Sequence, residues 1–259
     1  QGRGEVVGCE GGAATKMAME KCMRDCMKRN GGRQEQVAIA YDGYRRLGRG
    51  YTWAEDDRKV VTPDDKFLLG SVSKMFTHAA IKWLVDRDKL NFTDNVYPLL
   101  GYEPADRRAK IITIQHLLDH TAGYDRSMSD DIAFEFRKIA RLGPTNGKQP
   151  ATLRDMIEYM VRRPLDFTPG ERKAYSNYGT MLLGYVVANV TNKPYLKFLE
   201  EEILEGEDVK LYETGASKQK NDRIIQESIG IGLDPMNPLS DAHVPGAHGG
   251  DGAIKEESA

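Results

Sequence analysis

The order in which strand-like and helix-like stretches follow one another constrains the fold of this chain most strongly. A helix-like stretch over residues 15–30 is followed by a predicted hairpin, with strands at residues 36–44 and 49–54 and a glycine-containing connection. Helical periodicity then fills the middle of the chain, at residues 72–88, 111–119, 153–161, 178–190 and 195–204. Parallel α/β folds need strands and helices that alternate, so this order favours an α+β architecture with an antiparallel sheet.

Composition excludes several classes of protein. Of 259 residues, 40% are hydrophobic, which excludes a disordered chain, and 37 basic against 39 acidic residues give a formal charge of −2. A charge near zero gives no electrostatic reason to expect nucleic acid as the main partner. No run of about 18 apolar residues occurs, so we expect no membrane span. Three cysteines exclude a disulfide scaffold; three thiols, or one disulfide from Cys9 to Cys22 or Cys26, both fit the sequence.

The first candidate for chemistry is Ser71-Val-Ser-Lys74, at the start of the helical pattern over residues 72–88. Residues three apart share a helix face, and a helix N-terminus favours negative charge that develops on a serine oxygen. A lysine one turn away can help to take the serine proton. The same spacing recurs at Ser217-Lys-Gln-Lys220, but polar neighbours surround it, and we interpret it as surface. The Ser71–Lys74 pair therefore predicts that Ser71 is the nucleophile.

A second candidate is Tyr175-Ser-Asn177, which follows a Thr-Pro-Gly turn and precedes an apolar helix. A tyrosine near a lysine can act as a general base. The alternative interpretation is that Tyr175 packs in the core while Ser176 or Asn177 caps the next helix.

Two other motifs suggest a metal or a phosphate-binding loop, but each is incomplete, so we expect no metal and no cofactor. His116 and His120 have the spacing of a zinc helix but lack its glutamate, so we interpret them as helix-end structure. The segment from Gly143 to Gln149 is one residue short of a phosphate loop and lacks the serine or threonine after its lysine.

Together these motifs resemble one family. Leu69-Gly-Ser-Val-Ser-Lys-Met-Phe-Thr77 resembles the nucleophile segment of the serine β-lactamase-like and penicillin-binding family, in particular its class C β-lactamase and esterase branch. Thr113-Ile-Gln-His-Leu-Leu-Asp-His-Thr-Ala-Gly123 is similar to a helix-to-loop segment of that branch. Phe167-Thr-Pro-Gly170 and Tyr175-Ser-Asn-Tyr-Gly179 resemble its second motif, in order and at a fitting distance. The resemblance extends from about residue 15 to about residue 200.

The resemblance implies a role for each matching residue. Ser71 would attack a carbonyl and form an acyl-enzyme, and Lys74 and Tyr175 would share the work of general base and acid. Asn177 would bond Lys74 or the substrate amide. The backbone N–H of Ser71 would supply half of an oxyanion hole.

The resemblance also implies a third motif, on a strand that lines the site. His248-Gly249-Gly250 is one candidate for it, with His248 as a substrate-binding residue. The other interpretation is a Gly-Gly turn before a helix, in which case the third motif, the last strands and the C-terminal helix of the fold would lie beyond residue 259.

The resulting expectation is one β-lactamase/transpeptidase-like domain over residues 1–259, with an antiparallel sheet, flanking helices and a mainly helical subdomain. Residues 15–75 would supply the first helix, the first strands and the nucleophile, residues from about 90 to 205 the helical region, and residues 206–259 an irregular end. The expected function is a serine hydrolase for an ester, amide or lactam, with an esterase or D-peptidase favoured over an efficient β-lactamase. An acyltransferase, or a non-catalytic member that binds peptides or sugars, are the alternatives.

Overall fold

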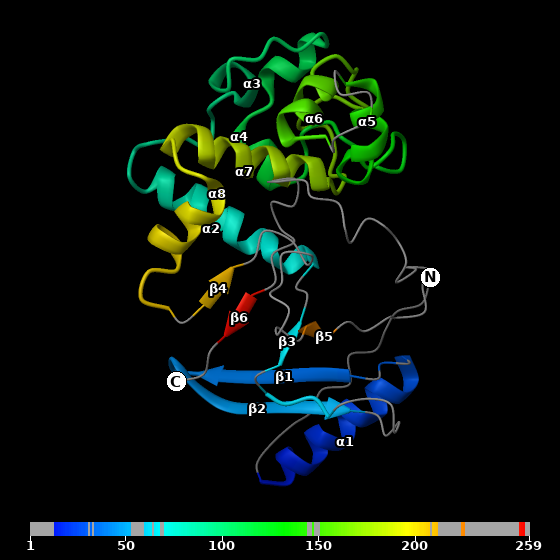
Figure 1. Ribbon diagram of the computed structural model, residues 1–259, viewed down its shortest axis with the longest axis vertical. Coiled ribbons are helices and arrows are strands. Elements are labelled where there is room, and N and C mark those ends of the chain that lie inside the picture. The colour runs from blue at the N-terminus through cyan, green and yellow to red at the C-terminus, as the bar shows by residue number, and fades with distance from the viewer. Residues whose placement is uncertain are drawn as a thin grey trace. The chain divides into compact units, whose positions relative to one another are not determined.

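The computed structural model describes residues 13–30, 32, 34–52, 60–63, 65–67, 70–143, 147, 151–207, 209–211, 224–225 and 254–256. The chain divides into two compact units (Figure 1). The hairpin unit comprises Gln1–Phe67 and Arg223–Asn237, and the helical unit comprises Leu68–Asp222 and Pro238–Ala259. Helices together with small antiparallel pairs of strands confirm the α+β class.

The hairpin unit begins with α1 (Ala13–Asn30), which lies beside the antiparallel pair β1 (Gln34–Tyr41) and β2 (Tyr44–Thr52) (Figure 1). The predicted helix and hairpin are confirmed, but the connection is not where we expected it. The turn is Asp42-Gly43, and both residues have positive φ (55° and 74°). Asp-Gly adopts this conformation readily, and it matches the twist of a two-residue hairpin.

Short strands pair segments that are distant in sequence. In the hairpin unit, β3 (Lys66–Phe67) pairs in parallel with β5 (Ile224–Ile225). In the helical unit, β4 (Val209–Leu211) pairs antiparallel with β6 (Ile254–Glu256). Each unit therefore contains residues from the region after residue 205 in which sequence periodicity predicts little.

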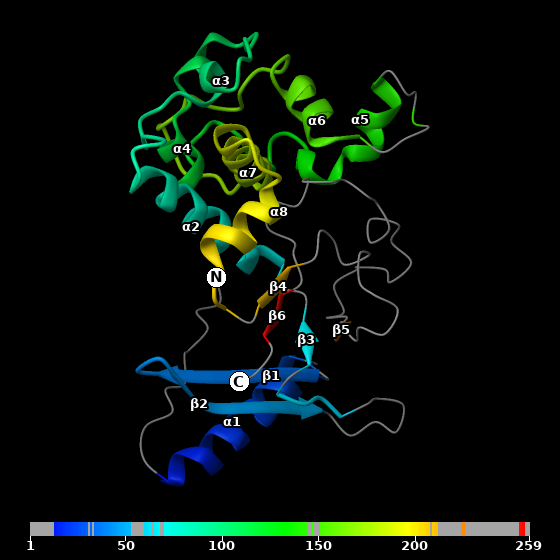
Figure 2. The ribbon, with the colours of Figure 1, turned by 60° about the vertical axis from the view of Figure 1, so that its left-hand side comes forward.

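The helical unit is built around α7 (Asn177–Thr191), which Figure 2 shows with other helices around it. It contacts α2 (Lys74–Val85), α4 (Ile114–Leu118), α6 (Leu153–Met160) and α8 (Tyr195–Phe198). Most residues of α7 are buried, as expected for a helix that is apolar on nearly every side. The core of the unit therefore forms around one central helix.

The remaining elements of the helical unit are short. They are the 3₁₀ turns η1 (Gly70–Ser73), η2 (Arg107–Ile111) and η3 (Ile132–Phe134), the helices α3 (Val96–Leu99) and α5 (Phe136–Leu142), and the π-turn η4 (Leu199–Ile203). Three expected helices are shorter than predicted, and the 111–119 helix is reduced to α4 at Ile114–Leu118. The first turn of the 72–88 helix is 3₁₀, and the 195–204 helix becomes a π-turn after four residues. None of the described helices combines the length and apolar content that crossing a bilayer requires.

Three tyrosines form a buried cluster inside this core. The Tyr97 hydroxyl lies 2.7 Å from the Tyr124 hydroxyl and 3.1 Å from the Tyr178 hydroxyl. The rings of Tyr124 and Tyr178 pack edge to face at 5.0 Å. Burial raises the pKa of all three side chains, so each hydroxyl keeps its proton and can donate. The cluster joins α3, the loop after α4 and the first turn of α7.

We expect Tyr97→Phe to destabilise the protein more than Tyr178→Phe. The first substitution removes both hydrogen bonds of the cluster, whereas the second removes only one. The expected losses in free energy of unfolding are about 2–3 and about 1 kcal/mol, because a buried hydroxyl that loses its partner keeps its desolvation cost. Urea denaturation of the two variants checks the order. Equal losses would contradict a central role for the Tyr97 hydroxyl.

Candidate active site

Ser71 lies in η1, the 3₁₀ turn that leads directly into α2. The turn starts at Gly70, whose φ of +51° suits a residue without a side chain, and the Ser73 hydroxyl closes it by donating to the Gly70 carbonyl at 2.6 Å. Ser71 itself is exposed. Lys74, the first residue of α2, donates from Nζ to the Ser71 Oγ at 3.2 Å. The predicted serine–lysine pair is therefore in contact.

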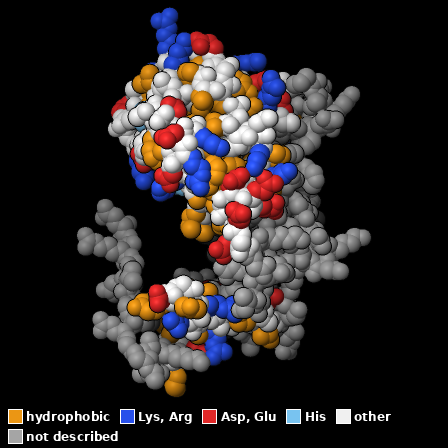
Figure 3. Space-filling model, turned by 90° about the vertical axis from the view of Figure 1, so that its left-hand side faces the viewer, with side chains coloured by type: hydrophobic (Ala, Val, Ile, Leu, Met, Phe, Trp, Pro, Cys, Tyr) orange, Lys and Arg blue, Asp and Glu red, His pale blue; other side chains and the backbone are white. Residues whose placement is uncertain are grey.

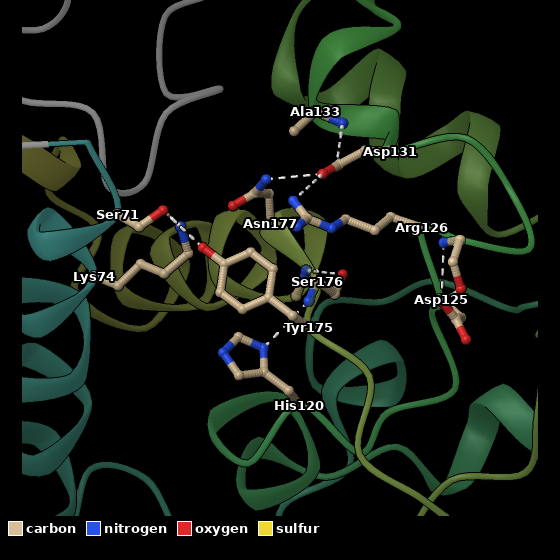
Figure 4. Close-up of polar contacts among 12 residues, drawn as sticks. Ser71, Lys74, His120, Asp125, Arg126, Asp131, Ala133, Tyr175, Ser176 and Asn177 are labelled. Atoms are coloured by element: carbon tan, nitrogen blue, oxygen red, sulfur yellow. Dashed lines mark hydrogen bonds and ion pairs between the residues drawn. The ribbon is translucent and has the colours of Figure 1, made fainter. Parts of the chain in front are cut away.

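Tyr175 meets this pair from a part of the chain 104 residues away. Its hydroxyl lies 2.7 Å from the Ser71 Oγ, at the point where Figure 4 shows Lys74, Ser71 and Tyr175 converging. The Ser71 hydroxyl can accept from the Lys74 Nζ and donate its own proton to the Tyr175 oxygen at the same time. The three predicted catalytic residues thus form one hydrogen-bonded group.

Two loops hold Tyr175 in place, and both were recognised in the sequence as motifs. The loop after α4 and the segment that leads to Tyr175 run side by side through three backbone hydrogen bonds: Asp166 N to Gly123 O, Gly170 N to Thr121 O, and Ala174 N to His120 O, at 2.8–2.9 Å. Gly123 has a φ of +101°, and a Cβ there would lie 2.7 Å from the Phe167 carbonyl oxygen. The glycine of Thr-Ala-Gly123 therefore permits this close approach.

The start of α7 fixes the residues after Tyr175. Ser176 is the N-cap, and its hydroxyl accepts from the Gly179 N–H at 3.1 Å. The capping predicted as an alternative is thus present, and it coexists with a Tyr175 that contacts Ser71.

His120 packs against Tyr175 on the side away from Ser71 (Figure 4). The two ring centroids are 4.8 Å apart, and the His120 Nδ1 accepts from the Ser176 N–H at 3.4 Å. Burial lowers the pKa of His120, and the positive charges of Lys173, His78 and Lys74 lower it further. The imidazole is therefore neutral at pH 7 and free to accept this hydrogen bond.

The two histidines of the expected helix end have separate structural roles. The His116 Nδ1 accepts from the Thr113 N–H at 3.2 Å in a capping box of α4, and His120 follows that helix with a φ of 59°. Among the residues that the structure describes, no group of three or more His, Cys, Asp or Glu side chains could hold a metal ion.

We expect His120 to make the protein less stable in mild acid. Its pKa in the folded protein lies below the unfolded value of about 6.5, so the unfolded chain binds the proton more tightly. The free energy of unfolding should therefore fall as the pH drops from about 6.5 through the folded pKa. In His120→Asn this fall should be smaller, because asparagine tolerates positive φ, offers an acceptor and does not titrate.

Urea denaturation of the wild type and His120→Asn at pH 7.5, 6.5 and 5.5 measures this difference. His78→Asn is measured beside it, because burial and Lys74 also lower the pKa of His78 and this variant gives the share of the fall that His78 contributes. Parallel pH curves for the wild type and His120→Asn would show that His120 does not carry the effect.

Two cations flank the ring of Tyr175. The Lys74 Nζ is 5.2 Å and the Arg126 guanidinium carbon 5.0 Å from the ring centroid. Both side chains thus place positive charge near the aromatic ring, which the ring quadrupole favours. Arg126 carries no signal in the sequence as a single residue, and the motifs there do not point to it.

Asn177, the first residue of α7, makes a contact that the sequence did not predict. Its amide nitrogen donates to the Asp131 Oδ2 at 2.8 Å, whereas we expected this side chain to bond Lys74 or the substrate amide. Asp131 also lies 3.8 Å from the Arg126 Nη1. The available sequence signal was an aspartate directly before the apolar residues Ile132-Ala-Phe134, which is typical of an N-cap. His248, the expected residue of the third motif, lies outside the described residues.

The loop that carries Arg126 is anchored by a charged network. Asp125 is buried, and its carboxylate accepts from the Ser127 hydroxyl and N–H and pairs with Arg172 at 2.7 Å. These hydrogen bonds, with the Arg172 charge, lower the pKa of Asp125 to about 2. The Asp166 carboxylate also accepts from the Asp125 N–H at 2.7 Å. Contacts to both the carboxylate and the backbone N–H of Asp125 therefore hold the loop in place.

On the face drawn in Figure 3, acidic and basic side chains are intermixed over the described part of the helical unit. The coloured residues of that face therefore form no extended patch of a single charge.

The β-lactamase family model matches residues 19–254. Among curated proteins, the chain is 28% identical over 207 residues to Protein flp of Staphylococcus aureus (strain N315). That alignment covers 78% of this chain and 38% of that protein, so the chain spans well under half the length of this relative.

Solved structures share the fold at low identity. One is EstCE1, described as a hydrolase with promiscuous acyltransferase activity, with a TM-score of 0.67 and 22% identity over 93% of this chain and 69% of that one. Another is a β-lactamase/D-alanine carboxypeptidase from Pseudomonas syringae, with a TM-score of 0.65 and 19% identity over 94% and 62% of the two chains. Both similarities confirm the β-lactamase/transpeptidase-like fold.

Proposed function

Because the chain belongs to the β-lactamase family, we propose that it is a serine hydrolase that works through a covalent acyl-enzyme at Ser71. One observation carries the proposal: the Ser71 oxygen is hydrogen-bonded to the Lys74 Nζ and to the Tyr175 hydroxyl at the same time. A nucleophile and a base within hydrogen-bond reach, with a third group that orients them, is the arrangement that acyl transfer requires.

In the proposed reaction, Tyr175 acts in its phenolate form. The Ser71 Oγ attacks the carbonyl carbon of the substrate, and the Ser71 proton passes to the phenolate oxygen, which becomes a neutral hydroxyl. Lys74, which is hydrogen-bonded to the Ser71 oxygen, and Arg126 place positive charge beside the phenolate before this transfer. The tetrahedral intermediate then expels the leaving group, which takes the proton from Tyr175. Water hydrolyses the Ser71 ester by the same steps and returns the enzyme to its starting state.

The proposed substrates are esters, amides or lactams, with an esterase or D-peptidase favoured over an efficient β-lactamase. The solved structures with this fold include a hydrolase with promiscuous acyltransferase activity and a β-lactamase/D-alanine carboxypeptidase, which is compatible with ester, amide and lactam substrates. An alcohol or amine that replaced water would make the same acyl-enzyme an acyltransferase, and a member without catalysis would bind peptides or sugars without acylation.

Covalent labelling tests the proposal. The protein is incubated with a fluorophosphonate, or with a penicillin, and its intact mass is measured. We expect a gain of one adduct that peptide mapping places on Ser71. Ser71→Ala should show no gain, and Ser217→Ala, the matched variant of the second Ser-x-x-Lys sequence, should label as the wild type does. An unlabelled wild type, or equal labelling of Ser71→Ala, would refute the acyl-enzyme and favour a binding protein.

A further inference from the structure

We propose that Asp131 is a positioning residue that holds the Asn177 amide with its carbonyl oxygen toward Lys74 and the acyl group of a bound substrate; this inference rests on the proposed function. Asp131 and Asn177 are 46 positions apart in the sequence, so the fold and not the local chain brings them into contact. The contact joins the cap of η3 to the first residue of α7.

The chemistry of the contact fixes which way the amide faces. A carboxylate only accepts hydrogen bonds, so only the nitrogen of the Asn177 amide can face the Asp131 Oδ2, at 2.8 Å. The carbonyl oxygen must then face the opposite way. Figure 4 shows this oxygen on the side where Ser71 and Lys74 lie. Asp131 therefore decides that the nucleophile faces an acceptor rather than a donor.

Asp131 is itself held in one orientation. Its second oxygen, Oδ1, accepts from the Ala133 N–H at 3.3 Å as the N-cap of η3, and only 14% of its side chain is exposed. Arg126 lies 3.8 Å from the Oδ2. Because both carboxylate oxygens have a partner, the side chain has little freedom to turn away from Asn177.

An outward carbonyl at Asn177 suits the proposed reaction. It can accept from the Lys74 ammonium or from the N–H of an acyl-side amide in the substrate. A reversed amide would present N–H groups to Lys74, and donor would face donor. Orientation of this group should therefore affect how fast the acyl-enzyme forms.

Asp131→Asn tests the inference with little risk to the fold. Asparagine caps helices as well as aspartate does, so its oxygen keeps the bond to the Ala133 N–H. The atom that faces Asn177 is then an NH₂ donor, which no longer fits the Asn177 amide nitrogen. Asp130→Asn is the matched control. It removes the same charge one position earlier, from an exposed side chain that pairs with Lys138.

The first measurement follows Asn177 directly and does not depend on activity. In protein labelled with ¹⁵N-asparagine, the Asn177 side-chain amide is identified by its absence from the spectrum of Asn177→Ala. We expect its resonances to move in Asp131→Asn and to stay in place in Asp130→Asn. Unmoved resonances in Asp131→Asn would overturn the inference, whether or not the protein is an enzyme.

The second measurement is a double-mutant cycle on kcat/KM for a chromogenic ester. Asp131→Asn should lower kcat/KM roughly tenfold in the wild type but less than about twofold in Asn177→Ala, because the residue acts through Asn177. Equal losses in the two backgrounds would overturn the inference. A wild type that is not labelled at Ser71 would instead refute the proposed function, and the amide resonances would still decide whether Asp131 orients Asn177.

Discussion

Ser71→Ala is expected to lower kcat/KM for an ester substrate by at least about 10³-fold, because the variant has no atom that can form the acyl bond. Ser71 is exposed, and its removal leaves the bond from Ser73 to Gly70 that closes the turn. The thermal midpoint should therefore stay close to that of the wild type. Steady-state hydrolysis of a chromogenic ester and a thermal melt measure the two quantities.

The sequence supplies a control for this variant. Ser217→Ala changes the same residue type at the same spacing from a lysine. We expect Ser217→Ala to leave kcat/KM unchanged. This result would show that a serine becomes the nucleophile through its position in the fold and not through the Ser-x-x-Lys spacing alone. A Ser71→Ala protein with wild-type activity would place the nucleophile elsewhere.

Tyr175→Phe and Lys74→Met are each expected to lower kcat/KM by about 10²–10⁴-fold. The first removes the oxygen that lies 2.7 Å from the Ser71 Oγ, and the second removes the ammonium that donates to it at 3.2 Å. Because the two residues act on one proton, the double variant should lose far less than the product of the two single losses. Hydrolysis rates of the three variants test this.

Tyr178→Phe is the matched control for Tyr175→Phe, since both change a tyrosine in the same motif. Tyr178 is buried in the tyrosine cluster, so this variant should lose stability and keep its activity. Tyr175→Phe should do the reverse. If the loss of kcat/KM in the double variant Tyr175→Phe/Lys74→Met equalled the product of the two single losses, the result would contradict the idea that both residues act on the same proton.

Local patterns predicted the longer helices of the helical unit but not α3 and α5. The period of apolar residues predicted α6 and α7 with bounds close to those observed, because each buries a continuous apolar face. It predicted α2 with two or three extra residues at each end. The hairpin was predicted but its turn was misplaced. Gly48 belonged to the expected connection, yet it lies inside β2. Gly50 is in β2 as expected, and a Cβ there would overlap the backbone of Val61.

Patterns were insufficient where a residue is chosen by its neighbours in space. The π-turn after α8 interrupts an unbroken helical period, and nothing in residues 199–203 alone marks it. Asp131 and Arg126 lie in a loop with no periodic pattern. Their importance arises only from the side chains they meet, Asn177 and Tyr175.

The sequence by itself determined the family, the order of the elements and the three residues proposed for catalysis, because nucleophile and base lie in short motifs with fixed spacing. The tertiary structure decided how those motifs act together. Ser71 and Tyr175 are 104 positions apart and meet where α2 packs against α7, while the loop after α4 hydrogen-bonds to the segment before α7. It also decided the direction of the Asn177 amide, since hydrogen bonds between distant side chains depend on distance and direction in space, which a linear sequence does not encode.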